Sequence, residues 1–227
     1  MTNKEALTLL ENGLVSKLID NTLLVCDSTE KDVSAFLEES LKYEFASVCI
    51  NPCWVSFAKS VVNSRIAVST VVGFPNGANT TFVKEKEAYL ALKDGAEELD
   101  MVVNIGKFKS NDLKYIENEI KLVKNIAGNN VLKIIIETCL LSEDEILRIS
   151  KIIEQSGGDY VKTSSGFSKY GATIEGVKRI KSAVSEKIGV KASGGIKNYS
   201  TLKDMVYAGA TRIGTSRGID IIRESNL

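Results

Sequence analysis

Short apolar runs recur along the chain and alternate with segments of helical periodicity. The runs are rich in β-branched residues and lack a regular apolar-polar alternation, which is typical of strands in a parallel sheet covered on both faces. Eight such runs predict strands at 18–20, 45–50, 65–72, 98–105, 131–138, 159–164, 188–193 and 211–216.

The segments between these runs predict helices with one apolar face each. Apolar residues at helical spacing form one stripe after Thr29 and another over 113–127. Ser142 to Glu145 has the spacing of a capping box, which predicts a helix start, and Gly157-Gly158 predicts where that helix ends. Further helices are predicted at 1–13, 52–62 and 202–209, and after 214–218.

Strand-then-helix units in a chain of 227 residues predict an α/β fold, a (β/α)8 TIM barrel with an extra N-terminal helix. An open doubly wound sheet is the alternative. The chain shows no linker, repeat or low-complexity stretch, so a single barrel domain is expected over 1–227.

The charge balance and the cysteines narrow the class of protein. Lys+Arg and Asp+Glu number 29 each, and no basic stripe is present, so neither nucleic acid nor a membrane surface is an expected partner. The four cysteines include no CxxC pair, and the N-terminus lacks the apolar core of a signal peptide. A cytoplasmic location is therefore expected.

The absence of histidine limits the chemistry most strongly. The commonest general base, the base of a serine-hydrolase triad and the imidazole ligands of catalytic zinc are all missing. Chemistry at neutral pH therefore has to use lysine, carboxylates, cysteine or hydroxyl groups.

Ionisable residues interrupt four of the predicted strands: Asp100, Lys133, Lys162 and Lys191. Taken singly, Lys133 or Lys191 has about even odds of being a lysine at a strand edge with its ammonium in water. Because strands four to seven of a barrel are neighbours, all four side chains can reach one pocket. Several converging charges in a core imply mutual pairing or a site that uses them.

Clustered lysines predict a nucleophilic amine. A second ammonium nearby and partial loss of water both lower the pKa of Lys162. A neutral amine attacks a carbonyl and forms a protonated imine, which accepts electrons when a carbon-carbon bond breaks. Asp100, paired with a lysine, can stay ionised and move protons through a water molecule.

Two glycine-rich segments follow the last two predicted strands, SGGI at 193–196 and GTSRG at 214–218. Barrels commonly bind phosphate with these loops, through backbone N–H groups and a helix N-terminus. An ordinary turn is the alternative for Gly194-Gly195. Ser216 adds a hydroxyl, and Arg217 is either a cation for the anion or a solvated helix residue.

Together these motifs resemble the deoxyribose-phosphate aldolase family over essentially the whole chain. The resemblance is carried by LIDNTLL at 18–24, SVCINP at 47–52, VVGFPNGA at 71–78, ELDMVVNIG at 98–106, LKIIIET at 132–138, VKTSSGFSKYGAT at 161–173, VKASGGI at 190–196 and RIGTS at 212–216. It implies reversible cleavage of 2-deoxy-D-ribose 5-phosphate into D-glyceraldehyde 3-phosphate and acetaldehyde, with no metal or organic cofactor. It also implies a homo-oligomer, a dimer or a tetramer.

The resemblance assigns roles to the charged strand residues. Lys162 resembles the imine-forming lysine, Lys191 the neighbour that lowers its pKa, and Asp100 the carboxylate that relays protons. Lys133 would support this network.

Further positions match the family's substrate site. Gly194, Gly195, Gly214 and Ser216 fall where the family holds the phosphate. Cys49 and Asp20 fall at strand ends that face the family's substrate pocket. The alternative for Cys49 is a merely buried small residue, and for Asp20 a structural hydrogen-bonding role.

The chain departs from the family pattern at several positions. Asn21 replaces a histidine, Asn76 replaces a common leucine, and Arg217 replaces a small residue. The end RESNL lacks the terminal tyrosine that some members use in proton transfer. Two other functions are alternatives to an aldolase: a phosphate-binding barrel enzyme whose lysine acts as a general acid, and a barrel that has lost its activity and serves as a binding or structural protein.

Overall fold

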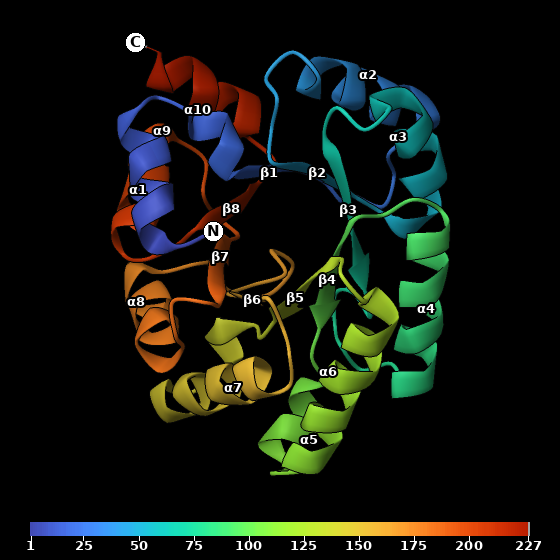
Figure 1. The fold of residues 1–227 in the computed structure, drawn as a ribbon, viewed down its shortest axis with the longest axis vertical. Coiled ribbons are helices and arrows are strands. Elements are labelled where there is room, and N and C mark those ends of the chain that lie inside the picture. The colour runs from blue at the N-terminus through green and yellow to red at the C-terminus, as the bar shows by residue number, and fades with distance from the viewer. Residues whose placement is uncertain (227) are drawn as a thin grey trace.

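The computed structural model describes residues 1–226, and its centre is a closed barrel of eight parallel strands (Figure 1). Each strand pairs with the next in sequence, and the last closes on the first. The strands are β1 (Ile19–Leu23), β2 (Ser47–Ile50), β3 (Ala67–Val72), β4 (Glu98–Val102), β5 (Val131–Ile135), β6 (Tyr160–Lys162), β7 (Gly189–Ser193) and β8 (Arg212–Thr215). The predicted barrel is confirmed, and the open sheet is wrong. Leu227, the last residue of the RESNL end, lies outside the described residues.

Helices surround the barrel (Figure 1). They are α1 (Asn3–Glu11), α2 (Glu30–Ser40), α3 (Val55–Val62), α4 (Thr81–Lys93), α5 (Ile105–Lys109), α6 (Leu113–Ala127), α7 (Glu143–Gln155), α8 (Ile174–Ala183), α9 (Tyr199–Tyr207) and α10 (Gly218–Ser225), with 3-10 turns η1 (Val15–Leu18), η2 (Pro52–Trp54) and η3 (Thr138–Leu140). The predicted capping box is present: Glu145 N donates to Ser142 Oγ at 3.3 Å, and Ser142 N donates to the Glu145 carboxylate at 2.7 Å.

Two predicted strands extend three residues beyond the carboxyl ends of the observed strands. The run at 98–105 is a strand only to Val102, and Ile105 already begins α5. The run at 131–138 is a strand only to Ile135, because Glu137 adopts left-handed backbone with φ +52° and turns the chain into η3. Hydrophobicity continues through these turns because their side chains are still buried.

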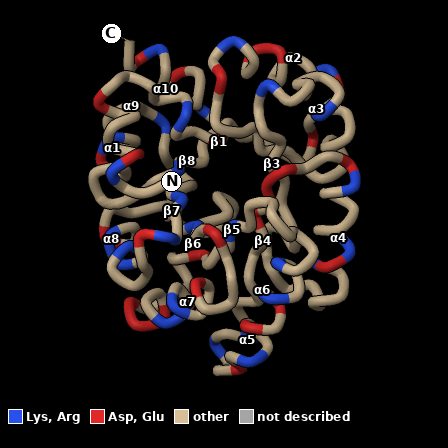
Figure 2. Tube along the Cα trace, viewed as in Figure 1, with Lys and Arg blue, Asp and Glu red and all other residues tan. Residues whose placement is uncertain are grey.

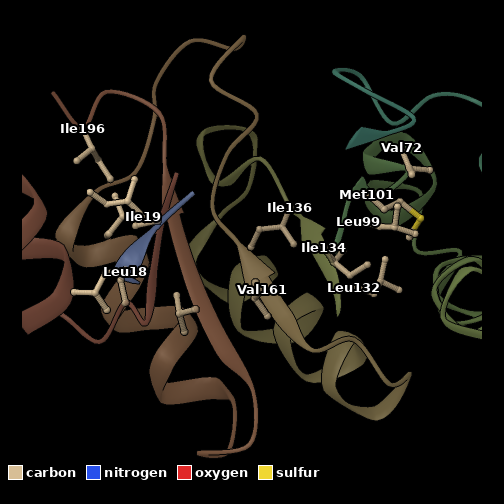
Figure 3. Close-up of a cluster of buried hydrophobic side chains, with 14 of the residues drawn as sticks. Leu18, Ile19, Val72, Leu99, Met101, Leu132, Ile134, Ile136, Val161 and Ile196 are labelled. Atoms are coloured by element: carbon tan, nitrogen blue, oxygen red, sulfur yellow. The ribbon is translucent and has the colours of Figure 1, made fainter. Parts of the chain in front are cut away.

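The main hydrophobic core lies between the barrel and its helices. Alternate strand residues such as Leu99, Met101, Leu132 and Ile134 point outward into it and are fully buried (Figure 3). The residues between them face the barrel interior, because successive side chains of a strand point to opposite faces. This places Asp100 and Lys133 inside the barrel, where the structure buries them completely.

Charges on the outer surface are mixed in sign. Figure 2 shows basic and acidic residues interspersed over the helices instead of forming a patch of one sign. Among residues 1–226, no helix combines the length and the apolar character needed to cross a bilayer.

Candidate active site

Lys162 opens onto a cavity at the carboxyl ends of the strands. It is the last residue of β6, it is only 3% exposed, and it lines a cavity of about 370 Å³. The rest of the lining comes from β1, β7, β8 and the loops after β1, β6, β7 and β8: Thr22, Leu23, Leu24, Val25, Ser165, Gly166, Phe167, Ser193, Gly194, Gly195, Ile196, Lys197, Gly214, Thr215 and Ser216.

Asp100 joins three lysines beneath this cavity. Its Oδ2 accepts hydrogen bonds from Lys162 Nζ at 2.6 Å and from Lys191 Nζ at 2.7 Å. Its Oδ1 accepts one from Lys133 Nζ at 2.9 Å. The strand register explains the convergence, because Asp100 lies opposite Lys133, and Lys162 lies opposite Lys191. The structure therefore brings all four predicted charges together.

The network continues toward the amino ends of the strands through Asp20, which the sequence predicted as a candidate binding residue, and through Glu98 and Arg212, which it did not. Lys191 Nζ lies 2.5 Å from Asp20 Oδ2, and Arg212 donates to Asp20 Oδ1 at 2.6 Å. Glu98 lies 2.5 Å from Lys133 Nζ and 3.4 Å from Arg212. The period of two along a strand could have indicated Glu98, because it faces the same way as Asp100.

Burial is the larger cause of the altered acidity of Lys162. Loss of solvent lowers its pKa, the charge of Lys191 lowers it further, and Asp100 acts in the opposite direction without reversing the shift. For Lys191, burial also disfavours the charge, but Asp100 and Asp20 overcome it and raise the pKa. Lys191 therefore holds its proton while Lys162 gives its proton up more readily.

One wall of the cavity is held by a buried carboxylate outside the network. Glu137 is 2% exposed and accepts hydrogen bonds from Ser165 N at 3.2 Å and from the Ser165 hydroxyl. Ser165 Oγ in turn accepts from Phe167 N at 3.1 Å. The Phe167 ring then packs edge-on against Phe74 at 5.2 Å. Glu137, Ser165 and Phe167 were not predicted as site residues, although they lie within the motifs LKIIIET and VKTSSGFSKYGAT.

The two glycine loops, after β7 and β8, line the neighbouring side of the cavity. Gly194 and Gly195 have φ of +85° and +80°, a region that favours glycine. A Cβ at Gly214 would lie 3.0 Å from Lys191 Cε, so this glycine also leaves room for the lysine stem. Ser216 lines the same side, together with Lys197, a cation that sequence reasoning missed.

Three predicted binding residues do not line the cavity. Lys133 and Asp20 lie in the charge network below it. Cys49 is fully buried and packs with Leu24 and Val71, and burial raises the pKa of its thiol. All three side chains are buried in the barrel and do not line the cavity.

Three of the residues that depart from the family pattern, Asn21, Asn76 and Arg217, do not line this cavity. Asn21 Nδ2 donates to Ser40 Oγ of α2 at 2.9 Å, so its side chain points out of the barrel. Arg217 pairs with Asp220 on the surface of α10 at 3.1 Å. Among residues 1–226, no group of three or more cysteine and acidic side chains has the arrangement of a metal site.

Fold and site together define a (β/α)8-barrel enzyme with a buried lysine beneath a glycine-walled cavity. The chain belongs to the DeoC/LacD family of aldolases, whose family model matches residues 14–225. It is 44% identical to a deoxyribose-phosphate aldolase of Mycoplasmopsis pulmonis over 94% of this chain and 97% of the relative. It is 46% identical to one of Lactococcus lactis over 92% and 95%. A tetrameric deoxyribose phosphate aldolase of Aeropyrum pernix superposes with a TM-score of 0.84 at 30% identity over 95% of each chain.

Proposed function

We propose that this aldolase reversibly cleaves 2-deoxy-D-ribose 5-phosphate into D-glyceraldehyde 3-phosphate and acetaldehyde through an imine on Lys162. The observation that carries the proposal is an amine at the floor of a cavity, with a pKa lowered by burial and by Lys191. The names of the relatives support the substrate.

The chemistry begins with the neutral amine of Lys162. Its nitrogen attacks C1 of the open-chain sugar, and uptake of one proton with loss of water gives a protonated imine. Removal of the proton from the C3 hydroxyl breaks the C2–C3 bond, and the electron pair moves into the imine to give an enamine. Glyceraldehyde 3-phosphate leaves. A proton then adds to C2, and water releases acetaldehyde and restores the amine.

Asp100 is the carboxylate that serves these proton transfers. Its Oδ2 contacts Lys162 Nζ directly, and the three lysine contacts hold its pKa well below the usual range despite its burial. It therefore stays ionised at neutral pH and can orient a water molecule that carries protons between the hydroxyl, the enamine and solvent.

The glycine loops orient the substrate. Backbone N–H groups at Gly194 and Gly195, the Ser216 hydroxyl and the Lys197 ammonium suit a phosphate dianion. Binding the phosphate there leaves the aldehyde end directed at Lys162, which lines the same cavity.

Trapping with borohydride tests the imine. Incubation with acetaldehyde or deoxyribose 5-phosphate, followed by reduction, is expected to add irreversible mass to the peptide that contains Lys162. With acetaldehyde, which has no phosphate, Lys197→Ala is a matched control, because it removes the other lysine of the cavity lining and leaves the adduct at Lys162. A peptide map without an adduct at Lys162 would exclude this mechanism and favour a barrel enzyme whose lysine acts as a general acid.

We also propose that the chain assembles as a homo-oligomer, a dimer or a tetramer. The tetrameric relative from Aeropyrum pernix supports this assembly. Sedimentation velocity over a range of protein concentrations tests it, and a monomer at every concentration would refute it.

A further inference from the structure

The interior of the barrel holds more cationic side chains than carboxylates. Four cationic side chains and three carboxylates make one connected network of ion pairs. The groups are Lys133, Lys162, Lys191, Arg212, Asp20, Glu98 and Asp100. Two further titratable groups lie against this network, the Cys49 thiol of β2 and the Tyr160 ring of β6, which lies 5.7 Å from the Arg212 guanidinium carbon.

A buried surplus charge is unfavourable, so one cation of this network is under pressure to lose its proton. Arginine does not lose its proton in proteins, which leaves the three lysines. Giving up the proton at one of them would leave equal numbers of positive and negative groups.

The number of carboxylate partners decides which lysine loses the proton. Lys133 lies within 4 Å of three carboxylates, at 2.5, 2.9 and 3.8 Å. Lys191 contacts two, at 2.5 and 2.7 Å. Lys162 contacts one, Asp100 at 2.6 Å. Consistent with this ranking, the pKa of Lys162 is lowered, whereas those of Lys133 and Lys191 are raised because their carboxylates outweigh burial.

Arg212 and Glu98 are the first residues of β8 and β4, whereas the cavity lies at the carboxyl ends of the strands. Neither lines the cavity or contacts Lys162. Arg212 is linked to Lys162 through Asp20, Lys191 and Asp100, which are joined in that order by ion pairs, and it also lies 3.4 Å from Glu98. Glu98 is linked to it through Lys133 and Asp100.

We propose that Arg212 and Glu98 are positioning residues that set the charge balance of the barrel interior and thereby determine the pH at which Lys162 becomes a nucleophile. This inference rests on the proposed function of Lys162. It assigns opposite effects to two side chains that a purely structural role would treat alike.

Two charge-removing variants test the inference. Arg212→Met removes the surplus positive charge, so Lys162 should keep its proton to higher pH. Glu98→Gln increases the surplus, so Lys162 should lose its proton at lower pH. Each shift should be about one pH unit, the value for charges about 10 Å apart at an effective dielectric constant of about 20. The double variant has the same surplus positive charge as the parent protein, and its rate of adduct formation should depend on pH as the parent's does.

The measured quantity is the initial rate of borohydride-trapped adduct formation with acetaldehyde as a function of pH. Arg212→Lys keeps the charge and should keep the parent profile. Arg223→Met and Glu39→Gln are matched controls, because they remove an exposed ion pair of 3.2 Å on the surface. Circular dichroism confirms that each variant is folded, and Glu98→Gln carries the test by itself if Arg212→Met does not fold.

Opposite shifts that cancel in the double variant support the inference. Shifts in the same direction, or unshifted profiles in folded variants, overturn it and leave the proposed function intact. A parent protein that forms no adduct at Lys162 overturns the proposed function, and the inference falls with it.

Discussion

Lys84 and Glu119 form a completely buried ion pair outside the barrel interior, and the substitution Lys84→Met tests what that pair contributes. Lys84 Nζ donates to Glu119 Oε1 and to the Val102 carbonyl, both at 2.8 Å. The second Glu119 oxygen accepts from Asn104 N at 3.1 Å. The pair therefore ties α4 and α6 to the carboxyl end of β4, two residues beyond Asp100.

Removing the lysine leaves a buried carboxylate without its partner. Such a change typically destabilises a protein by about 3–5 kcal/mol. For a chain of this size, each kcal/mol corresponds to about 2–4 °C in Tm, so a decrease of roughly 6–20 °C is expected. The double variant Lys84→Met/Glu119→Leu should recover part of this loss because it removes the buried charge, although the Asn104 N–H and the Val102 carbonyl then lack their side-chain partners.

The destabilisation should depend on pH in a defined direction. Burial raises the pKa of Glu119 even with Lys84 present, and removal of the lysine raises it further. A carboxyl whose pKa is raised in the folded state loses stability as pH increases above its usual value. The deficit of Lys84→Met should therefore be larger at pH 8 than at pH 5.

Urea unfolding at both pH values measures these differences. Lys121→Met is the matched control, because it removes an exposed lysine that lies 3.6 Å from Glu117 on α6. Its stability should not change measurably. Equal stability of Lys84→Met and the parent protein at pH 8, or a double variant less stable than the single one, would refute this reasoning.

The remaining predictions concern the cavity. Lys162→Ala should abolish turnover and leave a folded barrel, and substantial residual activity in a coupled assay for glyceraldehyde 3-phosphate would contradict its role. Lys191→Leu should raise the pKa of Lys162 by up to about two units, because both ammonium groups lie within 2.7 Å of one oxygen and are thus about 5 Å apart. The acid limb of the pH-rate profile should move to higher pH by that amount, and an unchanged profile would count against the effect. Ser216→Asp should lower kcat/KM for the phosphorylated sugar at least about tenfold and affect deoxyribose less. An equal loss for both sugars would mean that Ser216 does not contact the phosphate.

Much of the site could be predicted because the alternation of side chains along a strand also predicts which residues face the barrel interior. An ionisable residue inside an apolar strand of a closed barrel either faces the interior or disturbs the outer core. Asp100, Lys133, Lys162 and Lys191 therefore had to converge once the eight strands were recognised. The glycine loops followed from the same reasoning, because loops after successive parallel strands share one end of a barrel.

Other features depended on contacts that no local pattern encodes. Cys49 and Asp20 lie on barrel strands, yet neither side chain lines the cavity. The position of a side chain along the barrel axis depends on the stagger of the strands, which the sequence does not show. Asn21 follows Asp20 directly and points outward to Ser40, so its side chain does not line the cavity. Glu137 was not predicted as a site residue because it lies at the end of an apolar run whose sequence pattern predicts a strand, whereas its backbone is left-handed.

The sequence by itself determined the order of strands and helices and the charges of Asp100, Lys133, Lys162 and Lys191 within the strands, and it favoured a closed barrel over an open sheet, because each of these follows from local periodicity and short turns. Only the tertiary structure decided how those charges pair. Arg212 and Asp20 are 192 positions apart in the chain and meet at 2.6 Å, and Lys162 is left with a single carboxylate partner. Strand stagger and the competition among buried charges set these pairings, and both exist only once the barrel has closed.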